Sequence, residues 1–409
     1  MKIYEIIGKQ LNRSLDHFNI NKNLLNYLKE PNKVVNVNVP LKINDELKLF
    51  PGYRVQHNNI LGPYKGGLRF NPKVDLDECK ALSGWMTYKT ALHNLELGGG
   101  KGGIAINPFD YNDDQKEELC RNFIKLIHDD IGEGKDIPAP DVGTTPQMME
   151  WMNDEMINLT GKESNFTGKP IENKGCEGRT EATGYGCVEI LKYWAAKNKF
   201  PLYGSTYILQ GFGNVGMYTA KYLDSLGAKL LAVGDHSCYI KNKDGNGINV
   251  PQLINYVSNN KAIKGFSTNE ITLHEFWKIK CDVIIPAALE LQIDPEIAKL
   301  IECKVILEAA NGPLYFESDE ILENKNIDVL PDILTNSGGV IVSYYEYLQN
   351  INKKYPEEYL TKNETLNKLS KQLEVTFNNV YKLKQEKNTS YRNSSYGLAL
   401  MNLEKKFNY

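Results

Sequence analysis

One segment near the middle of the chain constrains the fold more than any other. The apolar run TYILQ (206–210) leads directly into the sequence GFGNVG (211–216), and a stretch with helical spacing of Tyr218, Tyr222 and Leu226 follows. A second apolar run, LLAV (230–233), then ends at Gly234 and Asp235. A strand, a glycine-rich turn, a helix and a second strand with an acid at its end are typical of a Rossmann fold that binds a dinucleotide.

Each glycine of the turn has a physical role in such a fold. Gly211 makes the turn, Gly213 lets a pyrophosphate approach backbone N–H groups, and Gly216 lets the helix pack closely on the strand. Asp235 is then placed to accept a hydrogen bond from a ribose hydroxyl. The alternative is that these glycines only punctuate a loop and that Asp235 is a solvated turn residue.

Asp235 also bears on the choice between NAD and NADP. A carboxylate accepts a hydrogen bond from a free 2′-hydroxyl but repels a 2′-phosphate, so we expect NAD. Lys241 and Lys243 follow closely in the sequence and could offset this repulsion. NADP therefore stays open.

The second half of the chain predicts a parallel sheet. Short apolar runs alternate there with segments of helical length, which is typical of a sheet covered on both faces. Besides 206–210 and 230–233, these runs are CDVII (281–285), KVILEA (304–309) and IDVL (327–330). From about residue 353 to the end the pattern is charged and helical.

Composition excludes several classes of partner. The chain has 409 residues, a length that predicts two or three domains, with 48 Lys and Arg against 51 Asp and Glu. No basic run argues for nucleic-acid binding, and no apolar stretch has the length of a signal peptide or membrane span, so we expect a cytoplasmic protein. The seven cysteines include no CxxC pair and the histidines are dispersed, so no metal site is predicted.

The segment from 62 to 103 is rich in glycine and contains three unusual lysines. Lys65, Lys89 and Lys101 lie there, Lys89 at helical spacing with Leu82 and Trp85, and Lys101 between glycines with no acid within four residues. A lysine that is desolvated beside other cations has a lowered pKa and can act as a general base or acid. The alternative is that these lysines reach solvent or decorate turns.

An acid downstream is the candidate partner of these lysines. Asp141 follows Pro138 and Pro140, which stiffen the chain, and precedes the helix start Thr145-Pro146. In isolation it could equally be a turn or capping carboxylate. Beside the lysines it becomes the candidate proton shuttle.

At this point the sequence resembles the family of glutamate, leucine, phenylalanine and valine dehydrogenases, and the glutamate enzymes most closely. The resemblance rests on several motifs in order: GPYKGGLRF, WMTYKTAL, GGGKGGI, DIPAPDVGT, TGKPI, GRTEATGYG, GFGNVG, AANGP and TNSGGVIVSYYE. It implies that Lys101 activates water and that Asp141 relays protons. It further implies that Lys89 binds the substrate α-carboxylate, and that Lys65 and Ser343 bind the distal carboxylate.

The resemblance also implies cofactor contacts besides those of the glycines, at Thr183, Asn214, Val215, Asn311 and Asn336. Lys65 distinguishes the subfamilies, since the branched-chain and aromatic enzymes have an apolar residue there and an unpaired buried lysine would be costly. One departure is Met86, where some relatives have a Gln that adds a carboxylate contact.

We therefore expect an α/β protein with a substrate-binding and oligomerisation domain (1–182), a Rossmann NAD(P)-binding domain (183–385), a cleft between them, and a C-terminal helical segment (386–409) that packs on the first domain. The expected reaction is the reversible oxidative deamination of L-glutamate to 2-oxoglutarate and ammonia, and the resemblance implies a homohexamer. The alternatives are a leucine, valine or phenylalanine dehydrogenase, or a catalytically silent nucleotide-sensing paralogue.

Overall fold

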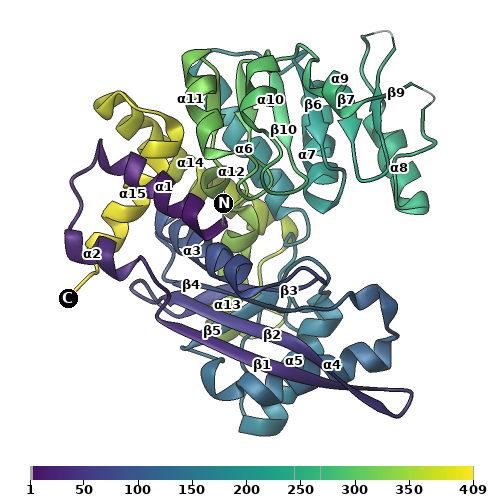
Figure 1. Cartoon of the computed structure of the whole chain (residues 1–409), viewed down its shortest axis with the longest axis vertical. Coiled ribbons are helices and arrows are strands. Elements are labelled where there is room, and N and C mark those ends of the chain that lie inside the picture. The colour runs from purple at the N-terminus through teal and green to yellow at the C-terminus, as the bar shows by residue number, and fades with distance from the viewer. Residues whose placement is uncertain (1–2, 244, 268, 409) are drawn as a thin grey trace. The chain divides into compact units, whose positions relative to one another are not determined.

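The chain forms two compact units in the computed structural model, which describes residues 3–243, 245–267 and 269–408 (Figure 1). The first unit comprises Met1–Arg179, Val340–Thr365 and Tyr396–Tyr409, within the described residues. The second comprises Thr180–Gly339 and Leu366–Ser395. Each unit contains one sheet and its covering helices, so the expected α/β class is confirmed.

The first unit is built on a mixed five-stranded sheet in the order β1-β2-β4-β3-β5. Strands β1 and β2 are antiparallel, as are β2 and β4, whereas β3 runs parallel to both β4 and β5. The strands are β1 (Lys33–Ile43), β2 (Glu46–Asn58), β3 (Tyr64–Phe70), β4 (Gly99–Ile104) and β5 (Asp136–Pro140). Strand β1 contains the run VVNVNVPLKI, whose alternation with a period of two favours a strand.

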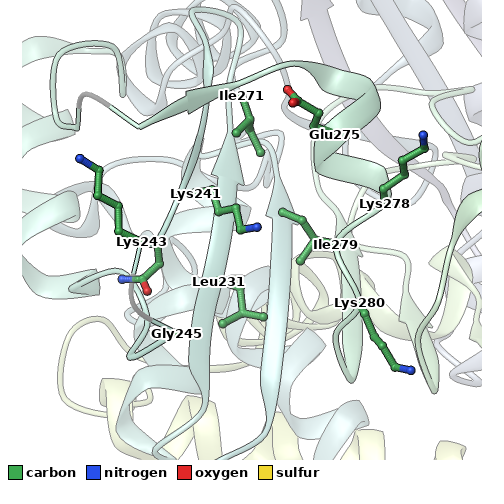
Figure 2. A pocket seen from close by; sticks show the side chains of 10 residues that line it. Leu231, Lys241, Lys243, Gly245, Ile271, Glu275, Lys278, Ile279 and Lys280 are labelled. Atoms are coloured by element: carbon green, nitrogen blue, oxygen red, sulfur yellow. The ribbon is translucent and has the colours of Figure 1, made fainter.

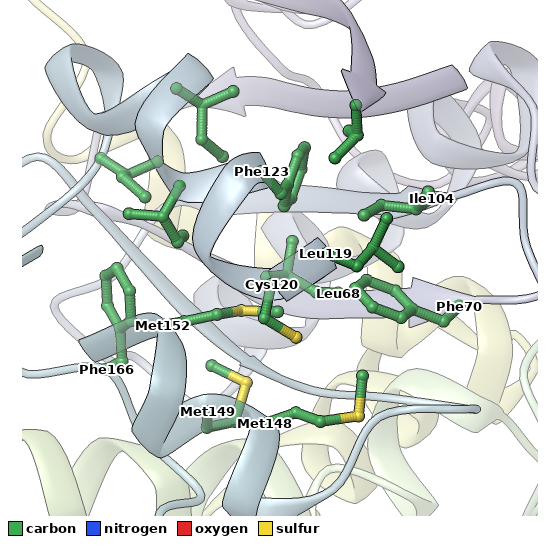
Figure 3. Packing of buried hydrophobic residues seen from close by; sticks show 14 of the residues in the cluster. Leu68, Phe70, Ile104, Leu119, Cys120, Phe123, Met148, Met149, Met152 and Phe166 are labelled. Atoms are coloured by element: carbon green, nitrogen blue, oxygen red, sulfur yellow. The ribbon is translucent and has the colours of Figure 1, made fainter. Parts of the chain in front are cut away.

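Helices cover both faces of this sheet. Helix α3 (Leu76–Leu92) packs against β2 and β4, while α4 (Asp113–Ile127) and α5 (Pro146–Thr160) lie on the other side (Figure 1). The core between the sheet and α4 and α5 is apolar, and Figure 3 shows Phe123 and Met152 of the helices in one cluster with Phe70 and Ile104 of the sheet. Further helices of the chain are α1 (Ile3–Leu15), α2 (Lys22–Tyr27), α13 (Gly338–Asn352), α14 (Lys362–Lys387) and α15 (Tyr391–Glu404), with short 3₁₀ turns at Pro108–Asp110, His128–Asp130 and Ile171–Asn173.

The glycine-rich segment serves the packing of this sheet. A methyl group at Gly66 would lie 1.6 Å from the carbonyl oxygen of Gly100, and one at Gly99 would lie 2.1 Å from Thr87 Oγ1 on α3. Such contacts are far shorter than any real carbon makes, so both positions require glycine. The backbone is thus brought close to neighbouring strands and to α3, which the sequence alone did not reveal.

The second unit contains a seven-stranded sheet in the order β12-β11-β10-β6-β7-β8-β9. The five strands from β12 to β7 are parallel, and they match the five apolar runs predicted from the sequence. Strands β8 and β9 extend the sheet antiparallel and were not predicted, because they are short. The strands are β6 (Thr206–Gln210), β7 (Lys229–Gly234), β8 (Tyr239–Lys241), β9 (Glu270–Ile271), β10 (Val283–Pro286), β11 (Val305–Leu307) and β12 (Asp328–Leu330).

Buried residues of this sheet pack against the connecting helices. Ile208, Ile284 and Ile306 from three parallel strands share a core with Phe276 and Trp277. The helices are α6 (Ala182–Lys197), α7 (Asn214–Ser225), α8 (Val250–Asn260), α9 (Leu273–Trp277), α10 (Pro295–Leu300), α11 (Phe316–Asn324) and α12 (Asp332–Thr335). Strands and helices alternate as in a Rossmann fold, with the antiparallel β8 as a departure.

The unit boundaries differ from the expected domains at two places. Val340–Thr365 belong to the first unit, although the sequence placed 183–385 in the second domain. The reason is that buried Ser343 and Glu346 of α13 hydrogen-bond to Thr167 and Gly168 of the first unit. Residues 386–395 belong to the second unit rather than to a C-terminal segment on the first, because Arg392 forms buried ion pairs there.

All seven cysteines are free thiols, and five of them are buried. Within residues 3–243, 245–267 and 269–408, no helix combines the length and apolar character needed to cross a membrane.

Candidate functional site

Three charged side chains that are distant in sequence meet on one face of the first sheet. Successive side chains of a strand point to opposite faces, so Leu68 and Phe70 of β3 enter the core while Arg69 points the other way. Lys101 of β4 forms an ion pair with Asp141, the residue that follows β5. Arg69 Nε donates a hydrogen bond of 2.9 Å to the second carboxylate oxygen of Asp141. The predicted pairing of Lys101 and Asp141 is thus present in the structure.

The environment of this pair shifts the pKa values of both Lys101 and Asp141. Burial lowers the pKa of Lys101, and Arg69 acts in the same direction, whereas the charge of Asp141 opposes them. Burial alone would raise the pKa of Asp141, but the charges and hydrogen bonds of Lys101 and Arg69 prevail and hold that pKa below its ordinary value. The Lys101 side chain is 5% exposed and that of Asp141 21%, so solvent reaches the pair from the carboxylate side.

The loop after β5 fixes the position of Asp141. Its backbone N–H donates to Thr144 Oγ1 at 2.8 Å, and the Thr144 hydroxyl donates to the carbonyl oxygen of Leu68 at 2.9 Å. A methyl group at Gly67 would lie 2.8 Å from Asp141 Cβ, so only glycine lets Asp141 approach β3 this closely. The rigidity predicted from the prolines is therefore joined by specific contacts.

Lys65 lies on β3 beside Ile137 of β5 and is 1% exposed. Burial lowers its pKa to about 7, the positive charge of Arg179 acts in the same direction, and the carboxylate of Glu346 opposes them. Among the described residues no side chain or backbone group hydrogen-bonds to its ammonium. A buried cation in this state is suited to receive a carboxylate from a ligand.

Ser343 and Lys89, the other predicted substrate residues, are also buried in the first unit. Ser343 is 2% exposed and its hydroxyl lies 2.5 Å from that of Thr167. Lys89 is 7% exposed on α3. The apolar spacing that singled out Lys89 proves less specific than expected, because α3 is buried nearly all round from Cys79 to Leu92, with Lys80 and Met86 half-buried.

Sequence reasoning did not single out three other residues of this region. Arg69 could have been found from strand alternation, because it shares a strand face with Lys65. Glu346 lies three residues after Ser343, which puts both on one face of a helix. Arg179 lies within the motif GRTEATGYG, and its Nε atom is buried without a hydrogen-bond partner.

The glycine turn of the second unit has the geometry expected for a dinucleotide. Gly211 has φ of +96°, and a methyl group there would lie 2.5 Å from the carbonyl oxygen of Ala287. A methyl group at Gly216 would lie 2.1 Å from the carbonyl oxygen of Gly211, so α7 packs tightly on the turn. At Gly213, which precedes the 12-residue α7, no atom of the described residues lies within 4 Å of the position that a methyl group would take. A pyrophosphate fits such a cradle.

Asp235 stands at the carboxyl end of β7, as predicted, but its carboxylate is already engaged. Oδ1 accepts hydrogen bonds from the N–H and hydroxyl of Ser237 at 2.7 and 2.5 Å, and Oδ2 accepts from the N–H of Ile263 at 2.9 Å. Burial alone would raise the pKa of Asp235, but these hydrogen bonds lower it. The group is therefore a fixed anion, and Oδ2, which accepts the single hydrogen bond from Ile263, has lone-pair capacity for a ribose hydroxyl.

The remaining predicted cofactor residues lie near the same edge of the sheet. Thr183 is half-buried in the first turn of α6, Val215 half-buried in that of α7. Asn214 donates a hydrogen bond to the carbonyl oxygen of Thr180. Asn311 follows β11, and its Oδ1 accepts a hydrogen bond of 3.0 Å from Asn336 Nδ2. In parallel sheets, ligands bind outside the carboxyl ends of the strands, where these residues lie.

A cavity of about 610 Å³ lies elsewhere in the second unit (Figure 2). Four of its lining residues are Lys241, Lys243, Lys278 and Lys280. Strand β8 is antiparallel to β7, with Tyr239 beside Gly234 but Lys241 beside Ala232, so β8 leads away from Asp235. The compensation of Asp235 by Lys241 and Lys243 that the sequence left open therefore finds no support in the fold.

Comparison with known proteins agrees with this geometry. Residues 175–409 match the family model described as Glutamate/Leucine/Phenylalanine/Valine dehydrogenase, and residues 31–158 match the Glu/Leu/Phe/Val dehydrogenase, dimerisation domain. The chain is 40% identical, over 92% of its own length and 90% of the relative's, to a NAD-specific glutamate dehydrogenase of Peptoniphilus asaccharolyticus. It is 38% identical to a NAD-specific glutamate dehydrogenase of Clostridioides difficile, over 97% of this chain and 95% of that one.

Solved structures give the same result. A hetero-hexameric glutamate dehydrogenase from Thermus thermophilus superimposes with a TM-score of 0.94 at 27% identity, covering 99% of this chain and 96% of that one. The glutamate dehydrogenase of Peptoniphilus asaccharolyticus superimposes with a TM-score of 0.84 at 35% identity, covering 99% and 98%. The resemblance inferred from the motifs is confirmed, and the chain belongs to the glutamate, leucine, phenylalanine and valine dehydrogenase family.

Proposed function

We propose that the chain is an NAD-dependent glutamate dehydrogenase, which oxidatively deaminates L-glutamate to 2-oxoglutarate and ammonia and runs in reverse to assimilate ammonia. The observation that carries this proposal is the ion pair of the buried Lys101 with the half-buried Asp141, on the same unit as the buried Lys65. Relatives at 37–40% identity named NAD-specific glutamate dehydrogenase support it.

Two cationic positions suit a dicarboxylic amino acid. Lys89 binds the α-carboxylate, and Lys65 with Ser343 binds the distal carboxylate. A leucine, valine or phenylalanine side chain would place apolar atoms against the Lys65 ammonium, which is 1% exposed and has no hydrogen-bond partner among the described residues, at a cost of several kcal/mol. This cost is the reason for preferring glutamate over the apolar substrates of other family members.

The chemistry rests on proton transfer by Lys101 and Asp141. NAD supplies the acceptor for the hydride that leaves Cα. Lys101, with a lowered pKa, takes a proton from the water that attacks the resulting imine, and Asp141 carries protons to and from the substrate nitrogen as ammonia leaves. Lys65 and Lys89 are held in place by the fold, so they can stabilise the two substrate carboxylates without a costly rearrangement of the protein.

We further propose that NAD is preferred to NADP, because the Asp235 carboxylate is a fixed anion that a 2′-phosphate would have to face. A cytoplasmic location and a homohexamer are also proposed. The hexamer draws on the family resemblance and on a structural relative described as hetero-hexameric.

The test follows nicotinamide absorbance with glutamate, leucine or phenylalanine, each with NAD and with NADP. Glutamate with NAD should give the highest kcat/KM, and Lys101→Ala should lower kcat by about 10²-fold or more with an unchanged melting temperature. Turnover of leucine or phenylalanine instead would support another member of the family. Absence of change with every pair would favour a silent nucleotide-binding paralogue.

A further inference from the structure

Helix α13 holds the segment Thr167–Lys169 through two side chains on one face. Ser343 and Glu346 are three residues apart, so they project side by side. The Ser343 hydroxyl lies 2.5 Å from that of Thr167, and Glu346 Oε1 accepts hydrogen bonds from the N–H groups of Gly168 at 2.8 Å and Lys169 at 3.4 Å. Glu346 thereby fixes the segment that contacts a predicted substrate residue.

The other oxygen of Glu346 is unusual. Glu346 is fully buried, yet its Oε2 has no hydrogen-bond partner among the described residues. A buried carboxylate oxygen without a donor is costly unless positive charge compensates it. Burial raises the pKa of Glu346, while the hydrogen bond from Gly168 and the positive charges of Lys169, Arg179 and Lys65 oppose this rise and favour the carboxylate.

The carboxylate of Glu346 in turn compensates the positive charge of the buried cations. Lys65 has no hydrogen-bond partner among the described residues, and the Arg179 Nε atom is buried without one. Besides Glu346, the charged groups acting on Lys65 are Arg54, Asp136 and Arg179. Arg54 and Asp136 form a closed, fully buried ion pair, so they nearly cancel, and Glu346 is the anion left to balance Lys65.

We propose that Glu346 is a positioning residue of the distal-carboxylate subsite, which holds the Thr167–Lys169 segment in place and supplies the resident negative charge that keeps Lys65 protonated before substrate binds. This inference rests on the proposed function, since Lys65 must bind the distal carboxylate. The Lys65 ammonium has no hydrogen-bond partner among the described residues, so it remains available to a ligand carboxylate while Glu346 acts on it by charge alone.

The decisive variant is Glu346→Gln. The amide oxygen can still accept the N–H of Gly168, so the segment stays in place, while the charge is lost. Lys65 then loses its proton at lower pH. If the pKa of Lys65 falls by about one pH unit, the protonated fraction of Lys65 falls up to about tenfold at pH values above that pKa. The ratio of glutamate KM in the variant to that in the wild type should therefore rise up to about tenfold between pH 6 and pH 9, with kcat within about twofold.

Two further variants separate charge from structure. Glu357→Gln removes an exposed carboxylate of the same unit and should leave the KM profile unchanged. Glu346→Ala removes both the charge and the acceptor, and should also lower kcat and the melting temperature. A ratio of KM values that does not change with pH in Glu346→Gln would overturn the proposal, because a purely structural role predicts a uniform loss.

Calorimetric titration with glutarate reads the same subsite without turnover. If the wild type binds glutarate and the affinity of Glu346→Gln falls more steeply with pH, the inference holds even should glutamate not be oxidised. Equal pH dependence of both proteins would refute it. No binding of glutarate and no turnover of glutamate by the wild type would reject the inference together with the proposed function.

Discussion

Replacement of Lys65 by methionine should stabilise the empty enzyme and the effect should depend on pH. Lys65 is 1% exposed and burial lowers its pKa from the ordinary 10.5 to about 7. Between these two values the unfolded chain holds a proton that the folded chain lacks, so folded-state stability rises with pH. The cost of burying Lys65 is fully present below pH 7 and disappears above pH 10.5.

The magnitude follows from linkage. The shift from 10.5 to about 7 spans 3.5 units, and each unit is worth about 1.36 kcal/mol, so the cost is on the order of 5 kcal/mol below pH 7. It falls to about 3 kcal/mol at pH 8 and to about 1 kcal/mol at pH 10. Methionine has a flexible, apolar side chain of similar length and does not titrate, so its packing adds only a constant. The stability gap between variant and wild type should close by about 4 kcal/mol from pH 6 to pH 10.

Thermal unfolding without substrate, at intervals from pH 6 to pH 10, measures this gap. At about 2–4 °C per kcal/mol, the difference in melting temperature should shrink by roughly 10 °C over that range. Lys48→Met, which changes an exposed lysine of the first unit, serves as the control and should show no such trend. In activity assays Lys65→Met should raise the KM for glutamate at least about thirtyfold, since a buried charge pair to the substrate is lost.

A gap that is constant with pH would refute the reasoning, because it would mean that Lys65 titrates alike in folded and unfolded chains. A variant with unchanged selectivity for glutamate would refute the assignment of Lys65 to the distal carboxylate.

Two more predictions concern the proton shuttle and the cofactor. Asp141→Asn should lower kcat by about 10²–10⁴-fold and, because the counter-charge of Lys101 is removed, move the acid limb of the kcat profile to lower pH. Steady-state kinetics from pH 6 to pH 10 checks this, and wild-type kcat in the variant would exclude Asp141 from proton transfer. Asp235→Ser should raise the ratio of kcat/KM for NADP to that for NAD by about tenfold or more, since a fixed anion near the ribose is removed. An unchanged ratio in assays with both cofactors would show that another group discriminates between them.

Sequence reasoning reached furthest where function depends on local chain geometry. The turn from Gly211 to Gly216 needs a strand before it and a helix after it, and all three are contiguous in sequence. Five apolar runs likewise predicted five parallel strands. The short strands β8 and β9 escaped prediction, because two or three residues carry no readable periodicity.

The glycine-rich segment shows where sequence reasoning stopped. The sequence of this segment predicts a ligand site from its glycines and lysines together. Gly66, Gly99 and Gly67 instead allow strand β3 to approach β4, β4 to approach α3, and Asp141 to approach β3. The lysines depend on this packing, because close approach of backbones is what removes Lys65 and Lys101 from water.

The family, the glycine turn and the candidate residues Lys65, Lys89, Lys101 and Asp141 can be read from the sequence, because each stands in a motif of adjacent residues. Which charges oppose one another depends on the tertiary structure. Lys101 meets Asp141 across 40 positions, Arg54 meets Asp136 across 82, and Glu346 reaches Gly168 across 178. Burial strengthens these pairings, because the interaction between two charges depends on their distance and on the exclusion of water. Neither quantity can be read from the sequence.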